Sequence, residues 1–320
     1  MKSKLIAFLL PLAFLNSQEI QPEDVAPLSA EEQQLSVQEY YSYMQEAIDD
    51  ADWWAAIDFG ELMLYHFPES PYGQEIPYFI GMAYYRLNQH ELANNALSEY
   101  LKNSTSPKYF EEALQTKFDI AEFYHKGGKK RLFSSHKLPA ILSAHEDALE
   151  IYDEVITTLP HHENSVRALL HKAQIQAYME DFKPGIESLQ LLIRRFPKHE
   201  LAPEAYFQIN KIYLDQCKID HLDPDLLELA AANLRKLRLA FPRDPKIAEA
   251  QKAYDELQEL FAENLLETGE FFQRRKQTAA SSIYFSKIVK EYPSTQTASK
   301  AQQKLDQQIK KNPTPADATP

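Results

Sequence analysis

The chain has 320 residues, of which 44% are hydrophobic and 25% are charged, a composition typical of a folded protein and not of a disordered one. With 34 basic and 47 acidic residues its net charge is −13, which disfavours nucleic acid as a partner. The 7 glycines are few for an enzyme that cradles phosphates in glycine-rich loops.

Residues 1–17 predict a secretory signal peptide. Lys2 and Lys4 precede an apolar run over 5–15, about half the length that a membrane-spanning helix needs. Residues 18–34 carry prolines and acidic residues without apolar periodicity, so we expect a flexible leader. We expect a disordered tail at 312–320, where proline, threonine and alanine dominate.

Between these ends, residues 35–311 show the spacing of amphipathic helices. Apolar residues recur at steps of three and four, and each run then stops at a proline, which cannot continue a helix. The intervals between these prolines are typical of helical-hairpin repeats. The prolines are Pro68, Pro107, Pro160, Pro197, Pro242 and Pro293.

The repeats fit the tetratricopeptide pattern of small, aromatic and alanine positions. Residues 76–105 place Gly81 and Tyr84 in a first helix and Ala93 in a second, and 265–293 repeats the pattern with Gly269. Small residues allow close helix crossing, and aromatics fill the space between hairpins. The predicted fold is therefore all-α, a tetratricopeptide-like right-handed solenoid of about six helical hairpins, with most of its aromatic residues in the core.

Two repeats are lengthened, by residues 129–144 and by residues 217–225, which we expect to form loops or extended helices. The first insert belongs to a basic cluster in an otherwise acidic chain. Two interpretations stay open for this cluster: a solvated loop, or a contact with an acidic partner or anionic lipid headgroups. Its members are Lys126, Lys129, Lys130, Arg131 and Lys137.

Motifs for chemistry are not found. The run from Gly127 to Lys130 departs twice from a phosphate-binding loop, and His161 and His162 have no second pair at metal-binding spacing. Cys217 is the single cysteine and is expected to be a buried apolar residue. We therefore predict no enzyme, no cofactor and no metal site.

Protein binding is the expected activity, on a wall formed by the first helices of the hairpins. Tyrosine offers a flat apolar face to a peptide, and arginine recognises a carboxylate. From the repeat register, the predicted partner-binding residues are Tyr41, Tyr78, Tyr85, Arg86 and Arg274.

The phrases "SPYGQEIPYF", "HELAPEAYF" and "TQTASKAQQKL", each after an aromatic-proline turn, resemble the BamD (YfiO) family, best over 265–305 and 35–124. The resemblance implies a periplasmic, all-helical, non-enzymatic scaffold at the outer membrane. Such a protein would bind the barrel-forming assembly subunit and client C-terminal signals, with possible peripheral membrane contact. Family members carry a lipid-modified cysteine after the signal peptide, and "LAFLNSQE" has none, which puts a lipid anchor in doubt.

Three alternatives remain at this point: a periplasmic repeat protein associated with the Tol–Pal system, a cytosolic tetratricopeptide chaperone or adaptor, and the accessory domain of an envelope enzyme.

Overall fold

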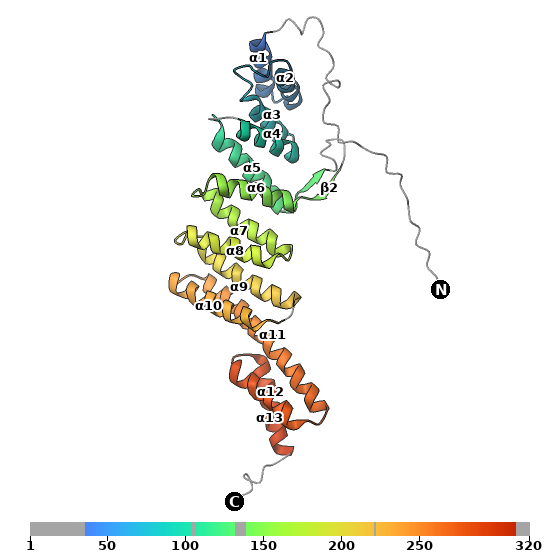
Figure 1. Cartoon of the computed structure of the whole chain (residues 1–320), viewed down its shortest axis with the longest axis vertical. Coiled ribbons are helices and arrows are strands. Elements are labelled where there is room, and N and C mark those ends of the chain that lie inside the picture. The colour runs from blue at the N-terminus through green and yellow to red at the C-terminus, as the bar shows by residue number, and fades with distance from the viewer. Residues whose placement is uncertain (1–35, 104–106, 132–138, 221, 312–320) are drawn as a thin grey trace, which may run out of the picture. The chain divides into compact units, whose positions relative to one another are not determined.

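The computed structural model describes residues 36–103, 107–131, 139–220 and 222–311, which form thirteen helices and one two-stranded sheet (Figure 1). The fold is all-α and built from helical hairpins, as predicted. The chain divides into two compact units, the N-terminal unit (Met1–Ala144) and the C-terminal unit (His145–Pro320). The predicted signal peptide, leader and tail lie outside the described residues, as does Lys137.

In the N-terminal unit each helix packs on its neighbours in the chain. Its elements are α1 (Val37–Asp49), α2 (Trp53–His66), α3 (Ile76–Arg86), α4 (His90–Asn103), α5 (Phe110–His125), β1 (Lys129–Arg131) and β2 (Ala140–Ser143).

The C-terminal unit continues the same arrangement, except that α11 packs on α9 and α10 as well as on α12 and α13. Its elements are α6 (His145–Thr158), α7 (Glu163–Tyr178), α8 (Phe182–Arg195), α9 (Ala202–Ile219), α10 (Pro224–Ala240), α11 (Lys246–Arg274), α12 (Thr278–Glu291) and α13 (Gln296–Lys311).

The aromatic-proline phrase forms the same helix end four times. In each case the aromatic residue follows the last helical residue, with φ between −127 and −135° and ψ between 51 and 66°. The following proline excludes the helical conformation here, while the aromatic N–H still donates to the carbonyl four residues earlier at 2.8–2.9 Å. These residues are Phe67, Phe196, Phe241 and Tyr292.

Two glycines mark close helix crossings, as the repeat pattern predicted. A Cβ atom at Gly81 would lie 2.8 Å from Leu97 Cγ, and one at Gly269 would lie 2.5 Å from Phe285 Cε1. Leu97 and Phe285 are fully buried. Each hairpin is therefore closed by a large apolar side chain that occupies the space a glycine leaves.

The insert at 129–144 was expected to be a loop or an extended helix, and this expectation was wrong. Strands β1 and β2 pair antiparallel, with Lys130 opposite Leu142 and an irregularity between Lys130 and Arg131. Gly127 turns the chain out of α5 with φ +92°, a conformation that side chains disfavour. The insert at 217–225 does extend a helix, since α9 runs to Ile219 and Asp223 then caps α10.

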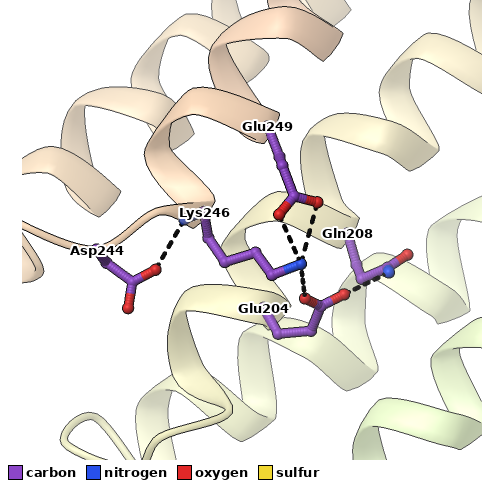
Figure 2. A network of polar contacts seen from close by, with 5 residues as sticks. All are labelled: Glu204, Gln208, Asp244, Lys246 and Glu249. Carbon is purple, nitrogen blue, oxygen red and sulfur yellow. Dashed lines mark hydrogen bonds and ion pairs between the residues drawn. The ribbon is translucent and has the colours of Figure 1, made fainter.

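Polar contacts fix the long helix α11 on its neighbours. Lys246 Nζ lies 2.7 Å from Glu204 Oε2 of α9 and 2.9 Å from Glu249 Oε1 of its own helix (Figure 2). Farther along α11, the Glu259 carboxylate accepts the backbone N–H groups of Gln296 and Thr297 at 2.8 and 2.9 Å. A carboxylate at a helix N-terminus is favourable, so α11 holds the start of α13.

Among the described helices, none combines the length and apolar character that crossing a membrane requires.

Candidate partner-binding surface

Four half-buried aromatic rings form a continuous series in the N-terminal unit, here called the aromatic ladder: Tyr41 of α1, Tyr72 of the α2–α3 turn, Phe79 of α3 and Tyr109 at the start of α5. Tyr41 stacks on Tyr72 with a centroid distance of 4.2 Å. Phe79 lies 6.4 Å from Tyr41 and 5.6 Å from Tyr109, edge to face in both cases. The ladder thus joins side chains from both helical hairpins and from α5.

Buried tyrosines hold the ladder from the core side. Tyr78, one of the predicted binding residues, is only 9% exposed and stacks on Tyr109 at 4.3 Å with the rings nearly parallel. Tyr100 lies 5.4 Å from Tyr78, and its hydroxyl accepts the Tyr109 N–H at 2.8 Å. Tyr109 is thus fixed at both ring and backbone, and Tyr78 supports the surface from within the core.

Charges near the ladder are mixed. Burial raises the pKa of the Tyr41 hydroxyl, and the Glu75 carboxylate adds to the rise. Lys108 Nζ lies 4.8 Å from the Tyr109 ring centroid, and its pKa is raised chiefly by its hydrogen bond with Tyr109. The ladder therefore has an ammonium group at its Tyr109 end, an arrangement that favours cation–π contact.

The other predicted binding residues lie at two separate places. Arg86 is exposed on α3, four residues beyond Met82 and seven residues beyond Phe79, and so shares their helix face. Tyr85 is half-buried, and its pKa is raised mainly by burial and then by Asp119 of α5. Arg274 belongs to the C-terminal unit, where it ends α11 with its side chain 70% exposed, 3.8 Å from Glu270.

The basic cluster is divided between helix α5 and strand β1. Lys126 caps the C-terminal end of α5, where a cation is favourable, and is exposed. Lys129, Lys130 and Arg131 form β1 and line a pocket of about 270 Å³ together with the start of α4 and the end of α5.

Three ladder residues, Tyr72, Phe79 and Tyr109, were not among the predicted binding residues. Tyr72 and Tyr109 both follow a Ser-Pro pair in the turn before a first helix, in "SPYG" and "SPKYF". This shared phrase is the signal that could have identified them. The repeat register considers only helical positions, so it passes over Tyr72 and Tyr109; Phe79 is helical, but the register did not select it.

A family model described as an outer membrane lipoprotein, YfiO, matches residues 140–315. The outer membrane protein assembly factor BamD of Vibrio cholerae serotype O1 is 26% identical over 132 residues, which are 38% of this chain and 55% of that protein. The chain thus matches about half the length of this curated relative.

Solved structures of repeat proteins are also similar. MamA from Desulfovibrio magneticus is 16% identical, with a TM-score of 0.33, over 65% of this chain and 97% of its own. A tetratricopeptide repeat protein from Parabacteroides merdae is 12% identical, with a TM-score of 0.35, over 85% of this chain and 98% of its own. At these TM-scores neither likeness bears on function.

Proposed function

Because the chain belongs to the YfiO family of outer membrane lipoproteins, we propose that it is a periplasmic scaffold that assists the assembly of β-barrel proteins into the outer membrane. It acts by binding proteins and catalyses no reaction. The observation that carries the proposal is the aromatic ladder, which we assign to binding extended segments of client chains.

The chemistry of barrel strands suits this surface. Strands of outer-membrane barrels alternate apolar and polar residues and carry aromatic residues near the membrane interfaces. The ladder offers the faces and edges of four rings, and aromatic pairs gain energy beyond their buried area. An unfolded barrel strand is therefore a better ligand for the ladder than a uniformly polar segment.

Spacing also favours an extended ligand. Side chains on one face of a strand repeat about every 6.6 Å, close to the 6.4 and 5.6 Å that separate Phe79 from its two ladder neighbours. A strand running along the ladder would bring successive same-face residues to successive rings.

Charge gives the ladder a preference among peptides. The Glu75 carboxylate adds to the raised pKa of Tyr41 in the ladder, and the Glu112 carboxylate adds to that of Tyr78 beneath the ladder, although burial is the larger cause in both cases. Acidic segments would be repelled by these carboxylates, whereas a free terminal carboxylate would be attracted to the exposed Arg86, which lies on the same face of α3 as Phe79. We therefore propose that clients enter as apolar, aromatic segments ending in a carboxylate.

The test is binding of a fluorescent synthetic peptide with the sequence of a barrel C-terminal strand, measured by anisotropy. Tyr72→Ala and Phe79→Ala should each weaken binding about tenfold, since one aromatic contact at a protein interface contributes about 1–2 kcal/mol. Amidation of the peptide's carboxyl end should weaken its binding to the unsubstituted protein. It should not change the peptide's affinity for the Arg86→Gln variant, which lacks the guanidinium group.

Tyr65→Ala is the matched control, because Tyr65 is half exposed on α2 and its ring contacts His66 and not the ladder. Equal loss of binding in this control and in the ladder variants would contradict the assignment. Circular dichroism melting of each variant separates lost binding from lost folding.

Location and partners are tested separately. Mass spectrometry of the mature N-terminus should find the signal peptide removed, and an intact Met1 would contradict export. Photo-crosslinking from position 82, on the same face of α3 as Phe79, should capture outer-membrane barrel proteins in native membranes. Recovery of Tol–Pal components in their place would favour the alternative periplasmic role.

A further inference from the structure

We propose that the pocket beside strand β1 binds the phosphate group of an anionic phospholipid, and that the paired strands β1 and β2, here called the hairpin, dock the N-terminal unit on a membrane surface. This inference is independent of client binding, because the hairpin and the aromatic ladder share no residues. It follows from the charge, the exposed apolar side chains and the pocket that meet at the hairpin.

Cationic side chains gather at the pocket beside β1. Three consecutive cations, Lys129, Lys130 and Arg131, line one pocket, and Glu91 is the acidic residue among its lining side chains. The pocket therefore has a positive balance in a chain whose net charge is −13. Such a local excess attracts an anionic surface from which the rest of the chain would be repelled.

The pocket itself suits a phosphate group with an organic substituent. The first turn of α4, from His90 to Leu92, forms one wall, and the first N–H groups of a helix have no partner within it. Phe123 forms an apolar wall, with its ring centroid 4.1 Å from that of His90. Burial lowers the pKa of His90, so this ring is neutral at pH 7.

His90 also leaves a polar atom for a ligand. Its Nδ1 is buried and has no hydrogen-bond partner among the described residues. An unpaired buried nitrogen costs free energy until a donor reaches it. The hydroxyl groups of a glycerol headgroup are such donors.

The apolar side of the hairpin selects a membrane over a soluble phosphate. Strand β2 is exposed along its length, with Ile141 55% and Leu142 38% exposed. Leu142 pairs directly with Lys130, so an apolar and a cationic side chain lie on neighbouring strands. Cations beside exposed apolar side chains are typical of elements that lie in a membrane interface.

Gly128 fixes the hairpin at the end of α5. A Cβ atom at this position would lie 2.4 Å from Phe123 Cε1, so any other residue would move β1 away from Phe123. This close approach brings the cations of β1 next to Phe123 of α5 and the first turn of α4, so that all three line one pocket.

Co-sedimentation of the full chain with vesicles tests the proposal. The protein should bind vesicles rich in phosphatidylglycerol and not vesicles of phosphatidylcholine alone. Lys129→Gln with Lys130→Gln should weaken binding by roughly 25-fold, about fivefold for each cation. The charge-matched control, Lys287→Gln with Lys290→Gln on α12, should bind as the unsubstituted protein does. Equal loss in both double variants would overturn the proposal, because it would show attraction by overall charge.

Two further variants separate the pocket from the surface. Ala140→Trp enlarges a pocket-lining side chain and keeps every charge, so we expect loss of phosphatidylglycerol binding; unchanged binding would overturn the pocket assignment. Ile141→Ser with Leu142→Ser should reduce vesicle binding and leave the affinity for soluble glycerol phosphate unchanged.

The source of the phosphate is decided by a separate titration. If inorganic phosphate or glycerol phosphate binds in the pocket but vesicles do not sediment the protein, the lipid proposal is overturned in favour of a soluble ligand. Client-peptide anisotropy on the same hairpin variants should be unchanged, so failure of lipid binding and failure of the proposed scaffold role give different results.

Discussion

In the N-terminal unit the contacts that shape the candidate site are between aromatic rings, whereas in the C-terminal unit polar side chains join the helices. Tyr78, Tyr100 and Tyr109 form one connected group in the first unit. In the second, Asn233 Nδ2 donates to Asn210 Oδ1 at 2.7 Å inside the core, and Lys246 joins α9 to α11. Contacts with ring faces can accommodate ligands of many shapes, whereas a buried amide makes its hydrogen bonds in only one geometry.

The family match covers the C-terminal unit and not the N-terminal unit, apart from residues 140–144. Residues 140–315 lie almost wholly in the C-terminal unit, while the aromatic ladder and the hairpin pocket lie in the N-terminal unit. The family assignment thus comes from the unit with the more specific polar packing. The two proposals about binding depend on the other unit's own side chains.

Stability measurements can separate the two units, because the two tryptophans, Trp53 and Trp54, both belong to the N-terminal unit. Tryptophan fluorescence therefore reports on that unit, and far-ultraviolet circular dichroism reports on both. Equal shifts of both signals in every variant would contradict this difference between the units.

The largest effect is expected from Tyr100→Ala. This side chain is 1% exposed and supports both Tyr78 and the Tyr109 backbone. Removing a buried aromatic side chain costs about 3–5 kcal/mol, so the fluorescence-detected transition should move to much lower denaturant. Tyr100→Phe keeps the ring and should cost about 1 kcal/mol for the lost hydroxyl acceptor. Equal losses in the two variants would show that ring packing is not the main contribution.

A smaller effect is expected from Asn233→Ala in the C-terminal unit. The change leaves Asn210 Oδ1 and the Tyr206 carbonyl without the amide that now donates to both. Unpaired buried acceptors cost about 2 kcal/mol, so the dichroism transition should shift more than the fluorescence transition. Asn264→Ala, at an exposed position of α11, is the control and should change neither.

Lys246→Met should cost about 0.5–1 kcal/mol at low salt, because its ion pairs are partly exposed. Hydrogen bonds to Glu204 and Glu249 raise the pKa of Lys246 above its usual 10.5. Its contribution is therefore fully present below pH 10.5 and is lost as pH rises through the folded-state pKa. Urea titrations from pH 9 to pH 12 should show this loss in the unsubstituted protein and not in Lys246→Met. The control Lys252→Met, on the same helix, should still show the loss of stability between pH 9 and pH 12.

The smallest effect is expected from Glu61→Gln in the N-terminal unit. Burial raises the pKa of Glu61 above 4.5, while its hydrogen bond from the Tyr84 hydroxyl, at 3.2 Å, opposes the rise. The unit therefore loses stability as pH rises through the folded-state pKa. Glutamine keeps the acceptor and removes this loss, so the variant should be more stable at pH 7 by a few tenths of a kcal/mol, since Glu61 is partly solvated. The difference should vanish below pH 4, and a variant less stable at pH 7 would contradict the sign.

Much of the fold was predictable because it depends on local signals. The aromatic-proline phrase predicted the helix ends, and Gly81 and Gly269 predicted the close crossings, since both effects depend on backbone sterics at a few positions. The ladder was less predictable. Tyr41, which the repeat register selected, lies in the ladder, whereas Tyr78, at another selected position, is buried. The difference arises because solvent exposure depends on which neighbours cover a helix face.

By itself, the sequence determined the helical hairpins, the glycines at their close crossings and the resemblance to the YfiO family. Each of these depends on residues that are close together in the chain. Only the tertiary structure decided that Tyr72 and Tyr109, which are 37 residues apart in number, join one aromatic series. It also decided that the basic insert is a β-hairpin beside α4. The physical reason is that strand pairing and ring stacking depend on contacts between distant segments, which no local pattern encodes.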